Sequence, residues 1–489
     1  MTAMKTMPEE PPMTVLLGLP FHDVTLEETL EFCEAAMTAK ECRYLVTANV
    51  DFTTQAYADV DLRKIVFYAD RVVCDGMPLV WLSRIFGYPL RERVAGSDMV
   101  PRLLEICGRE GLAVYFFGSD LATLEEAKVI VEQRYPGLRV VGMDSPPFGA
   151  VVEWDNEALC ERMRASGANL LLACLGCPKQ ERWIYAHHRE TGIPLSIGVG
   201  ASLDFITGKQ KRAPRWMQKT GLEWFWRMAG NPSRLAKRYG HDFIFLTRAA
   251  LRQAWSQRRR GDLADLHAGR RKSTAEVKVE VQRLEWCGEL RKADLDGAPL
   301  PEAVEKTVLL DASRIGFTDS SGLGRLAMLV RMCRAAGKDL ILLNPSSVFR
   351  NAVIDSKMDS LMVMADDHDA ALRLAQTAVQ AGVKSKVAQD GVLRVAFDRS
   401  LDAFYHDEML AVLESAAAGA GEGASLVVDL AEVPFIDSRA VGGLIRALKI
   451  MKAKGGGLFI ARPSPAVREI IGLLRIDKVI EEWKGDLPS

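Results

Sequence analysis

Residues 170–181 read LLLACLGCPKQE, and this stretch shows how the first half of the chain is built. Its five apolar residues, Leu170–Cys174, are typical of a buried strand, and Gly176 marks a turn before a helical stretch. The same order recurs from about residue 15 to 246, with further strands predicted at Tyr44–Thr47, Val72–Cys74, Ala113–Phe117, Arg139–Val141 and Leu195–Ile197. Strands that alternate with helices predict a mostly parallel α/β sheet.

Polar residues and glycines follow the predicted strands. In parallel α/β sheets the residues just after the carboxyl ends of the strands face the ligand crevice, and glycines there let backbone N–H groups approach a phosphate. These positions hold Thr47-Ala48-Asn49, Asp75-Gly76, Gly118-Ser119, Gly176-Cys177-Pro178-Lys179-Gln180 and Gly198-Val199-Gly200. None has the spacing of a dinucleotide fingerprint or a P-loop, so those two enzyme classes are not supported.

Two motifs have a spacing that metal sites use, but neither fits such a site. Asp59-Val60-Asp61 has D-x-D spacing, yet it lies in a helical stretch and not after a strand. Cys174 and Cys177 have no second Cys-x-x-Cys pair to complete a zinc site. We therefore expect no metal.

Charge is distributed unevenly along the 489 residues. The whole chain has 63 Lys and Arg against 64 Asp and Glu, but residues 209–272 hold 17 basic residues, four acidic residues and four of the nine Trp. This segment is thus +13 and the remainder −14. Basic residues interleaved with Trp fit a surface that lies on anionic lipid, a nucleic-acid patch, or a solvated basic helix and linker.

The composition excludes several classes of protein. With 48% hydrophobic residues the chain can bury substantial cores, and its longest apolar run is far shorter than the roughly 18 residues of a membrane-spanning helix. The N-terminus has no apolar signal-peptide core, and Pro11-Pro12 fits a flexible tail over residues 1–13. Nine Cys without framework spacing fit reduced thiols, so we expect a cytoplasmic protein.

The second half contains an internal repeat with an offset of 118 residues. LLDASRIGFTDSSGLGRLAMLVRMCRAAGKDLILLNPSSVFR (309–350) aligns without a gap with VVDLAEVPFIDSRAVGGLIRALKIMKAKGGGLFIARPSPAVR (427–468). Each copy predicts a strand (Val308–Asp311; Leu426–Asp429), a helix of about 16 residues and a second strand (Leu340–Leu343; Leu458–Ile460). Two small α/β domains are therefore predicted.

An Asp-Ser pair precedes each repeated helix, where such residues ordinarily cap backbone N–H groups. A strand ending in Asp followed by FTDSSGL (317–323) resembles the STAS family, which includes anti-sigma-factor antagonists. The resemblance implies that Ser320 is a phosphorylation site and that the modules bind a serine kinase or an anti-sigma-like partner. In the second copy Ser438 is the corresponding candidate, although Arg439 and Ala440 replace the second Ser and the Gly.

The strand-end residues together resemble the WecG/TagA/CpsF glycosyltransferase family from about residue 15 to 245. The resemblance rests on an ordered series of motifs: TANVDF (47–52), ADRVVCDGMPLVW (69–81), RVAGSD (93–98), YFFGS (115–119), LGCPKQE (175–181), GVGASLDFITGKQKRAPRWMQKTGLEWFWRM (198–228) and NPSRLAKRY (231–239). It implies a Rossmann-like domain that transfers a sugar from a UDP donor to a polyprenyl-diphosphate-linked saccharide in surface polysaccharide synthesis. It further implies inversion at the anomeric carbon and no required cofactor.

The same resemblance implies functions for individual residues. Asp75 would be the base that takes the proton from the acceptor hydroxyl, with Thr47 and Asn49 positioning the substrates. Arg93 and Gln180 would contact the sugar and the diphosphate. The other predicted substrate-binding residues are Gly118, Lys179, Gly200, Asp204, Arg212, Arg227, Arg234 and Arg238. The basic segment over about 209–255 would be an appendage that docks on an anionic membrane surface.

We therefore predict a tail (1–13), a WecG/TagA/CpsF-like domain (14–255), a basic linker (256–274) and two STAS domains (275–380 and 386–489). The first hypothesis is a STAS-regulated glycosyltransferase, peripheral to the inner face of the plasma membrane, whose sugar is of the N-acetylmannosamine type, a uronic acid or glucose. The alternative is a STAS-based signalling or scaffold protein whose transferase half senses a nucleotide sugar. Nucleic-acid binding is not expected, because no RNP-like, helix-turn-helix or zinc pattern accompanies the basic segment.

Overall fold

The computed structural model describes residues 5–214, 216–217, 223, 225–226, 240, 242–249, 251, 281–291, 295, 298–336, 338–368, 370–372, 383–389, 392–397, 401, 406–433, 435–485 and 487. The chain divides into two compact units. Unit 1 comprises Met1–Pro146, Leu159–Ile184 and His188–Ala375, and unit 2 comprises Pro147–Ala158, Tyr185–His187 and Gln376–Ser489. Among the described residues, no helix has both the length and the apolar composition needed to cross a bilayer.

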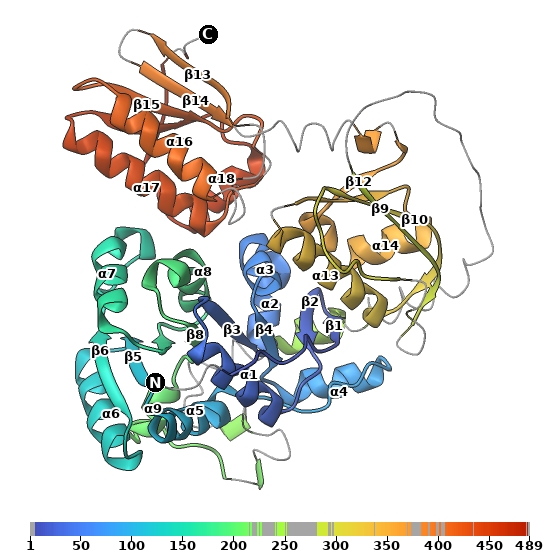
Figure 1. Cartoon of the computed structure of the whole chain (residues 1–489), viewed down its shortest axis with the longest axis vertical. Helices are drawn as coiled ribbons and strands as arrows, with labels where there is room; N and C mark the ends of the chain where they lie inside the picture. The colour runs from blue at the N-terminus through green and yellow to red at the C-terminus, as the bar shows by residue number, and fades with distance from the viewer. Residues whose placement is uncertain are drawn as a thin grey trace. The chain divides into compact units, whose positions relative to one another are not determined.

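A six-stranded parallel sheet in the order β4-β3-β8-β7-β5-β6 forms the centre of the first half (Figure 1). Its strands are β3 (Arg43–Ala48), β4 (Arg71–Cys74), β5 (Ala113–Gly118), β6 (Arg139–Asp144), β7 (Leu170–Cys174) and β8 (Leu195–Gly198). All six strands predicted from the sequence are present, and the mostly parallel α/β class is confirmed. Strand β7 is buried along its whole length, as its continuous apolar run requires.

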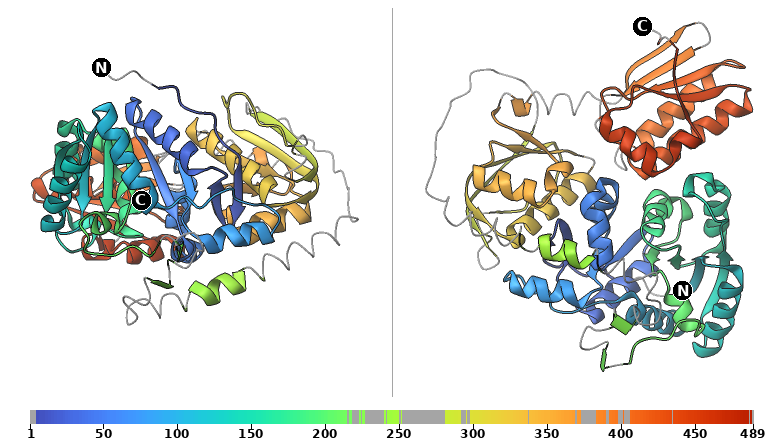
Figure 2. Two further views of the ribbon diagram at one scale, coloured as in Figure 1. Left: turned by 90° about the horizontal axis from the view of Figure 1, so that it is seen from below. Right: turned by 180° about the vertical axis from the view of Figure 1, so that it is seen from behind.

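Helices cover both faces of this sheet (Figure 2). The helices of the first half are α1 (Leu26–Thr38), α2 (Val50–Ala58), α3 (Val60–Phe67), α4 (Met77–Ile85), α5 (Gly96–Glu110), α6 (Leu121–Arg134), α7 (Asn156–Ser166), α8 (Lys179–Thr191) and α9 (Ser202–Ile206), and the short 3-10 helix η1 (Val151–Glu153) belongs to unit 2. On one face, side chains of α1, α5 and α6 share a core with Phe116. On the other, the Trp183 ring of α8 lies 4.2 Å from the ring of Phe117, because successive side chains of a strand point to opposite faces.

An antiparallel hairpin, β1 (Met13–Leu16) and β2 (Leu19–His22), precedes the sheet. It shortens the tail predicted over residues 1–13, since Met13 already belongs to β1. The carbonyl of Pro12 accepts a hydrogen bond from the amide of Asp23 at 2.9 Å. The side chains of Met13 and Val15 are buried, so apolar packing and not chain flexibility decides where the ordered part begins.

The first repeat forms a four-stranded parallel sheet in the order β12-β11-β10-β9. Its elements are β9 (Gln282–Leu290), β10 (Val308–Thr318), α13 (Ser320–Ala335), β11 (Leu340–Leu343), α14 (Ser347–Asp355), η2 (Met358–Leu361) and β12 (Val363–Ala365). All of these elements belong to unit 1 together with the six-stranded sheet, which differs from the separate domain predicted over 275–380.

The second repeat forms a five-stranded sheet in the order β13-β14-β15-β16-β17, in which only the β13–β14 pair is antiparallel. Its elements are β13 (Val383–Gln389), β14 (Val392–Phe397), α16 (His406–Gly419), β15 (Ser425–Asp429), α17 (Ser438–Ala453), β16 (Gly457–Ala461), α18 (Pro465–Leu473), η3 (Ile476–Lys478) and β17 (Glu481–Glu482). Helices α13 and α17, and likewise α14 and α18, begin and end 118 residues apart. The offset read from the sequence is therefore also the offset between corresponding helices.

Candidate active site

The carboxyl ends of β3 and β4 bring the three predicted catalytic residues together. The two strands are neighbours in the sheet, and the amide of Asp75 donates to the carbonyl of Ala48 at 2.9 Å. Gly76 lies close to Asn49, because a Cβ at position 76 would be 3.8 Å from the Asn49 Cα. Thr47 faces the start of α5, since a Cβ at Gly96 would be 3.7 Å from its Oγ1.

Asn49 has a structural function in addition to the predicted one. It is the N-cap of α2, and its Oδ1 accepts a hydrogen bond from the amide of Phe52 at 3.0 Å. A contact with a substrate would therefore fall to the NH2 group of its side chain.

Arg93 connects Asp75 to two further carboxylates. Its Nη1 lies 4.0 Å from Asp75 Oδ1 and 3.2 Å from Glu223 Oε2, while its Nη2 lies 2.6 Å from Asp98 Oδ2. Arg212 donates to the other oxygen of Asp98 at 2.7 Å and to the carbonyl of Ser97 at 3.2 Å. Asp98 thus holds two guanidinium groups at the first turn of α5, next to the predicted base.

Asp98 and Glu223 were not assigned a function from the sequence, although Asp98 stands in the motif RVAGSD (93–98) and Glu223 in the motif over residues 198–228. Their place in those motifs was the signal by which the sequence could have indicated a function for them. What could not be read from the sequence was that Glu223 meets Arg93 across 130 positions of chain. The cluster of Asp75, Asp98, Glu223, Arg93 and Arg212 is partly buried, with Asp75 exposing 26% of its side chain and Arg93 15%.

Gln180 joins the ends of β7 and β8. Its Oε1 accepts from the amides of Gly176 at 3.1 Å and Gly200 at 3.2 Å, and its Nε2 donates to Glu181 Oε1 at 2.8 Å. A Cβ at Gly198 would be only 2.5 Å from that nitrogen, so the glycine makes room for the amide. The side chain of Gln180 therefore positions the two strand-end loops, and its predicted contact with the diphosphate stays a prediction.

Glu181 is a buried acid in the first turn of α8. It stands in the motif LGCPKQE (175–181), but the sequence did not assign it a function. Burial raises the pKa of this carboxyl to about 7, against the opposing effect of its hydrogen bond from Gln180. Lys179, a predicted substrate-binding residue, is the first residue of the same helix. Lys179 is therefore at the N-terminus of α8, where the backbone N–H groups also attract anions.

Gly118 and Asp204 lie near the end of β7. Gly118 has a φ of +92°, and a Cβ there would come within 2.7 Å of Leu175 Cδ2, so no other residue fits easily. Burial raises the pKa of Asp204 on α9, and its Oδ2 accepts a hydrogen bond from Gln210 Nε2 at 3.2 Å. Both residues are thus at the predicted edge of the sheet.

Asp59 and Asp61, the carboxylates with D-x-D spacing, both pair with Arg182. Asp61 Oδ2 lies 3.2 Å from the Arg182 Nε, and Asp59 accepts from Nη2 of the same guanidinium while capping α3. Both carboxylates are thus paired with the same arginine of α8.

The phosphorylation candidates begin the repeated helices, as predicted. Asp319 caps α13 by accepting from the amides of Ser321 and Gly322 at 2.7 and 3.0 Å, and Asp437 caps α17 in the same way at Arg439 and Ala440. Ser320 is 3% exposed, so a kinase could reach it only after this part of unit 1 opens. Phosphorylation of Ser320 or Ser438 stays a prediction.

Three predicted substrate-binding residues, Arg227, Arg234 and Arg238, lie outside the described residues. The described part of the basic segment has apolar side chains directed to solvent. Trp216 is 60% exposed, Phe243 71% and Leu251 66%. The segment is attached to the first half through the ring of Phe245, which lies 5.1 Å from the ring of Tyr57 on α2.

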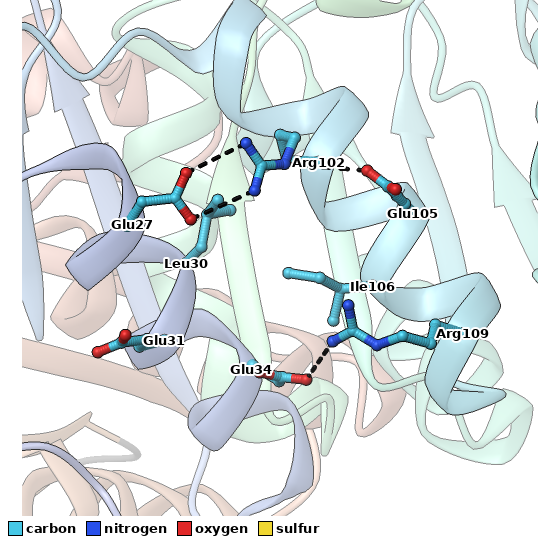
Figure 3. Close-up of a pocket in the computed structure, with 8 residues that line it drawn as sticks. All are labelled: Glu27, Leu30, Glu31, Glu34, Arg102, Glu105, Ile106 and Arg109. Atoms are coloured by element: carbon cyan, nitrogen blue, oxygen red, sulfur yellow. Dashed lines mark hydrogen bonds and ion pairs between the residues drawn. The ribbon is translucent and has the colours of Figure 1, made fainter.

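A surface hollow of about 180 Å³ between α1 and α5 is a poor alternative site (Figure 3). Both of its arginines are already paired, Arg102 with Glu27 at 3.1 Å and Arg109 with Glu34 at 2.8 Å. It lies between helices and not at the carboxyl ends of the strands, where a parallel sheet presents its ligand site.

Comparison with known proteins identifies two families in the chain. The profile of the glycosyl transferase WecG/TagA/CpsF family matches residues 14–260, and that of the STAS domain matches residues 384–486. The assignment of the first repeat to the STAS family stays a prediction.

Curated relatives match the first half. One from Bacillus spizizenii is 29% identical over 191 residues, covering 39% of this chain and 72% of the relative, and is called N-acetylglucosaminyldiphosphoundecaprenol N-acetyl-beta-D-mannosaminyltransferase. A relative of the same name from Bacillus subtilis is 25% identical over 218 residues, covering 44% of this chain and 83% of the relative. A solved anti-sigma-factor antagonist (STAS) domain protein from Planctomyces limnophilus has 22% identity over 22% of this chain and 92% of its own, with a TM-score of 0.20 that is too low to support an argument.

Proposed function

Because the chain belongs to the WecG/TagA/CpsF glycosyltransferase family, we propose that it transfers a sugar from a UDP-sugar to a polyprenyl-diphosphate-linked saccharide. The observation that carries this proposal is the cluster around Asp75, in which Thr47, Asn49 and Arg93 meet at the ends of two neighbouring strands. The names of the relatives favour an N-acetylmannosaminyl group as the sugar and a lipid-linked N-acetylglucosamine as the acceptor.

In the proposed reaction Asp75 takes the proton from the acceptor hydroxyl as that oxygen attacks the anomeric carbon of the donor. The new bond joins the acceptor oxygen to the anomeric carbon, and the bond from that carbon to the UDP oxygen breaks. Attack from the side opposite to UDP inverts the anomeric configuration. Arg93 orients the carboxylate of Asp75, from which its Nη1 is 4.0 Å away.

The departing UDP carries negative charge that the protein has to stabilise. Lys179 at the start of α8 and Arg212 beside Asp98 are the described cations proposed for this task. Gln180 would act indirectly, by holding the amides of Gly176 and Gly200 at the strand ends.

The acceptor lipid requires the enzyme to work at a membrane surface, and we propose the inner face of the plasma membrane. Exposed apolar side chains in the basic segment support this, including Trp216 and Phe243. Helix α4, which begins two residues after Asp75, adds Trp81 (41% exposed) and Ile85 (77%), which are four positions apart and thus on one side of the helix.

Membrane binding is tested by co-sedimentation with vesicles of anionic or neutral lipid. Cutting the chain before Lys211, or the substitution Phe243→Asp in the full chain, should reduce binding to anionic vesicles. The matched control Leu121→Asp changes an exposed leucine on α6 and should bind as the unmodified protein does. Undiminished binding of both the truncated chain and Phe243→Asp would contradict the docking proposal.

The activity is tested with a panel of UDP-sugars and a short-chain lipid-diphosphate acceptor that carries N-acetylglucosamine. Asp75→Asn should fold and lose transfer, while the exposed control Glu126→Gln should remain active. Transfer by Asp75→Asn at the unmodified rate would remove Asp75 as the base. Binding of a UDP-sugar without transfer by the unmodified protein would favour the alternative of a nucleotide-sugar sensor.

We further propose that the STAS part regulates the transfer. The match of residues 384–486 to the STAS family supports a domain of this kind in unit 2, and its partner would be a serine kinase or an anti-sigma-like protein.

A further inference from the structure

Helix α13 of the first repeat packs directly on the N-terminal hairpin of the transferase half (Figure 1). Met13 and Val15 of β1 belong to the same buried core as Leu326 and Val330 of α13. The backbones approach so closely that a Cβ at Gly324 would overlap the carbonyl of Met13.

The corresponding glycine of the second repeat gives an internal comparison. Gly442 occupies the same position in α17, 118 residues later, and a Cβ there would meet nothing within 4 Å. The close approach at Gly324 is thus a property of the first copy and not a requirement of the repeated fold.

A group of charged and polar side chains, here called the junction, lies where α13 meets the hairpin. It consists of Glu10, His22, Asp70, Arg71 and Arg331. Arg331 pairs with Glu10 Oε1 at 3.1 Å and donates to the carbonyl of Asp70 at 3.3 Å.

The junction is continuous with the two strands that end at the predicted catalytic residues. His22 Nδ1 lies 2.9 Å from the amide nitrogen and 3.3 Å from the carbonyl oxygen of Val72 in β4. His22 Nε2 lies 3.2 Å from Glu10 Oε1 and 3.0 Å from Arg331 Nη1. The carboxylate of Asp70 accepts from the amide of Tyr44 in β3 at 2.9 Å.

We propose that Arg331 of the first repeat is a positioning residue for transfer, which holds β3 and β4 in place through Glu10, His22 and Asp70. Strand β4 ends one residue before Asp75, so a shift of β4 moves the base relative to the acceptor hydroxyl. On this proposal the first repeat is a fixed part of the transferase. The side of α13 that carries Gly324 and Arg331 is covered by the N-terminal segment of the same chain. The positioning of Asp75 rests on the proposed function, whereas the fastening of β4 does not.

The test compares Arg331→Met with Arg331→Lys and with the control Arg325→Met in the full chain. Arg325 lies on the same helix, but its Nε donates to Ala298 within the first repeat. Two measurements are made on each protein: amide hydrogen exchange of β2 and β4, and steady-state kcat and KM. Gly324→Ala and its counterpart Gly442→Ala give a second, independent pair.

For Arg331→Met we expect exchange in β4 to speed up about tenfold and kcat to fall about 10- to 100-fold with KM for the donor nearly unchanged, since a small misplacement of a reacting group has effects of this size. Arg331→Lys should recover part of both, and Arg325→Met should match the unmodified protein. Gly324→Ala should loosen β2 and β4, and Gly442→Ala should not.

Unchanged exchange in β4 for both Arg331→Met and Gly324→Ala would overturn the fastening. Faster exchange with unchanged kcat would overturn the positioning function. If no donor supports transfer by any of these proteins, the proposed function fails, and the exchange data still decide whether Arg331 holds β4.

Discussion

Acid should loosen the junction between the first repeat and the transferase half through a single histidine. The side chain of His22 has no exposed surface. Burial lowers the pKa of His22 from its ordinary value of 6.5 to about 4, with Arg331 and Arg71 acting in the same direction and Glu10 opposing them. A protonated ring would also place a second positive charge beside Arg331, whose Nη1 lies 3.0 Å from His22 Nε2.

The sign and size follow from the difference between the two states. Between pH 6.5 and 4 the unfolded chain binds a proton at His22 and the folded chain does not, so stability is present above pH 6.5 and is lost as the pH falls toward 4. At about 1.4 kcal/mol for each pKa unit, the full loss is about 3 kcal/mol, and about 2 kcal/mol of it falls between pH 7 and pH 5. Glu10 changes stability in the same direction, because its pKa is lowered to about 2 by His22 and Arg331 although burial alone would raise it.

The assay is the opening free energy of β2 and β4 from amide hydrogen exchange at pH 7 and pH 5. The reference is His22→Asn, whose side-chain oxygen can accept from Val72 but does not titrate. Because every other titrating group is common to both proteins, the His22 contribution is the difference between their two pH dependences. Equal pH dependences in the unmodified protein and His22→Asn would refute the reasoning.

Three further predictions concern the candidate site. Asp98→Asn removes the carboxylate that holds Arg93 and Arg212, so kcat should fall about 10- to 100-fold with the melting temperature little changed, and an unaltered kcat would show that the two arginines do not need it. Burial raises the pKa of Glu181 to about 7, so the ionisation of this carboxyl opposes folding increasingly as the pH rises from 4.5 to 7. In denaturant titrations the free energy of unfolding of Glu181→Gln should exceed that of the unmodified protein by up to about 3 kcal/mol at pH 8 and should equal it at pH 4. An equal difference at both pH values would contradict this. Gly118→Ala combines the strain of a φ of +92° with a contact of 2.7 Å to Leu175. The control Gly87→Ala, with a φ of +82° and nothing within 4 Å of the added Cβ, has the strain alone. In unfolding experiments Gly118→Ala should lose at least about 1 kcal/mol more stability than Gly87→Ala, and equal losses would show that Leu175 can move aside.

The sequence alone predicted the class of fold and the place of the site. Apolar runs such as Leu170–Cys174 report burial directly, because a strand covered on both faces has no polar position. Asp75, Thr47 and Asn49 could be grouped before any coordinates, since the carboxyl ends of parallel strands meet at one edge of a sheet. The repeat offset of 118 residues likewise gave the helices of both copies, which depend on local periodicity and capping residues.

Contacts between distant parts of the chain could be found only in the tertiary structure. Nothing local to Arg331 indicates that it meets Glu10 and Asp70, and nothing local to Gln180 indicates that its amide joins two loops. Nothing local to Met13 and Val15 indicates that they share a core with Leu326 and Val330 of α13, more than 300 residues later.

Periodicity, capping and turn residues act over a few positions, and the sequence by itself therefore determined the strands, the helices and the edge of the sheet that holds the candidate base. The partner of a buried charge or of an exposed apolar edge depends on which surfaces meet after the elements have formed. Tertiary packing determines which surfaces meet, and it places Arg93 among three carboxylates and α13 against the hairpin.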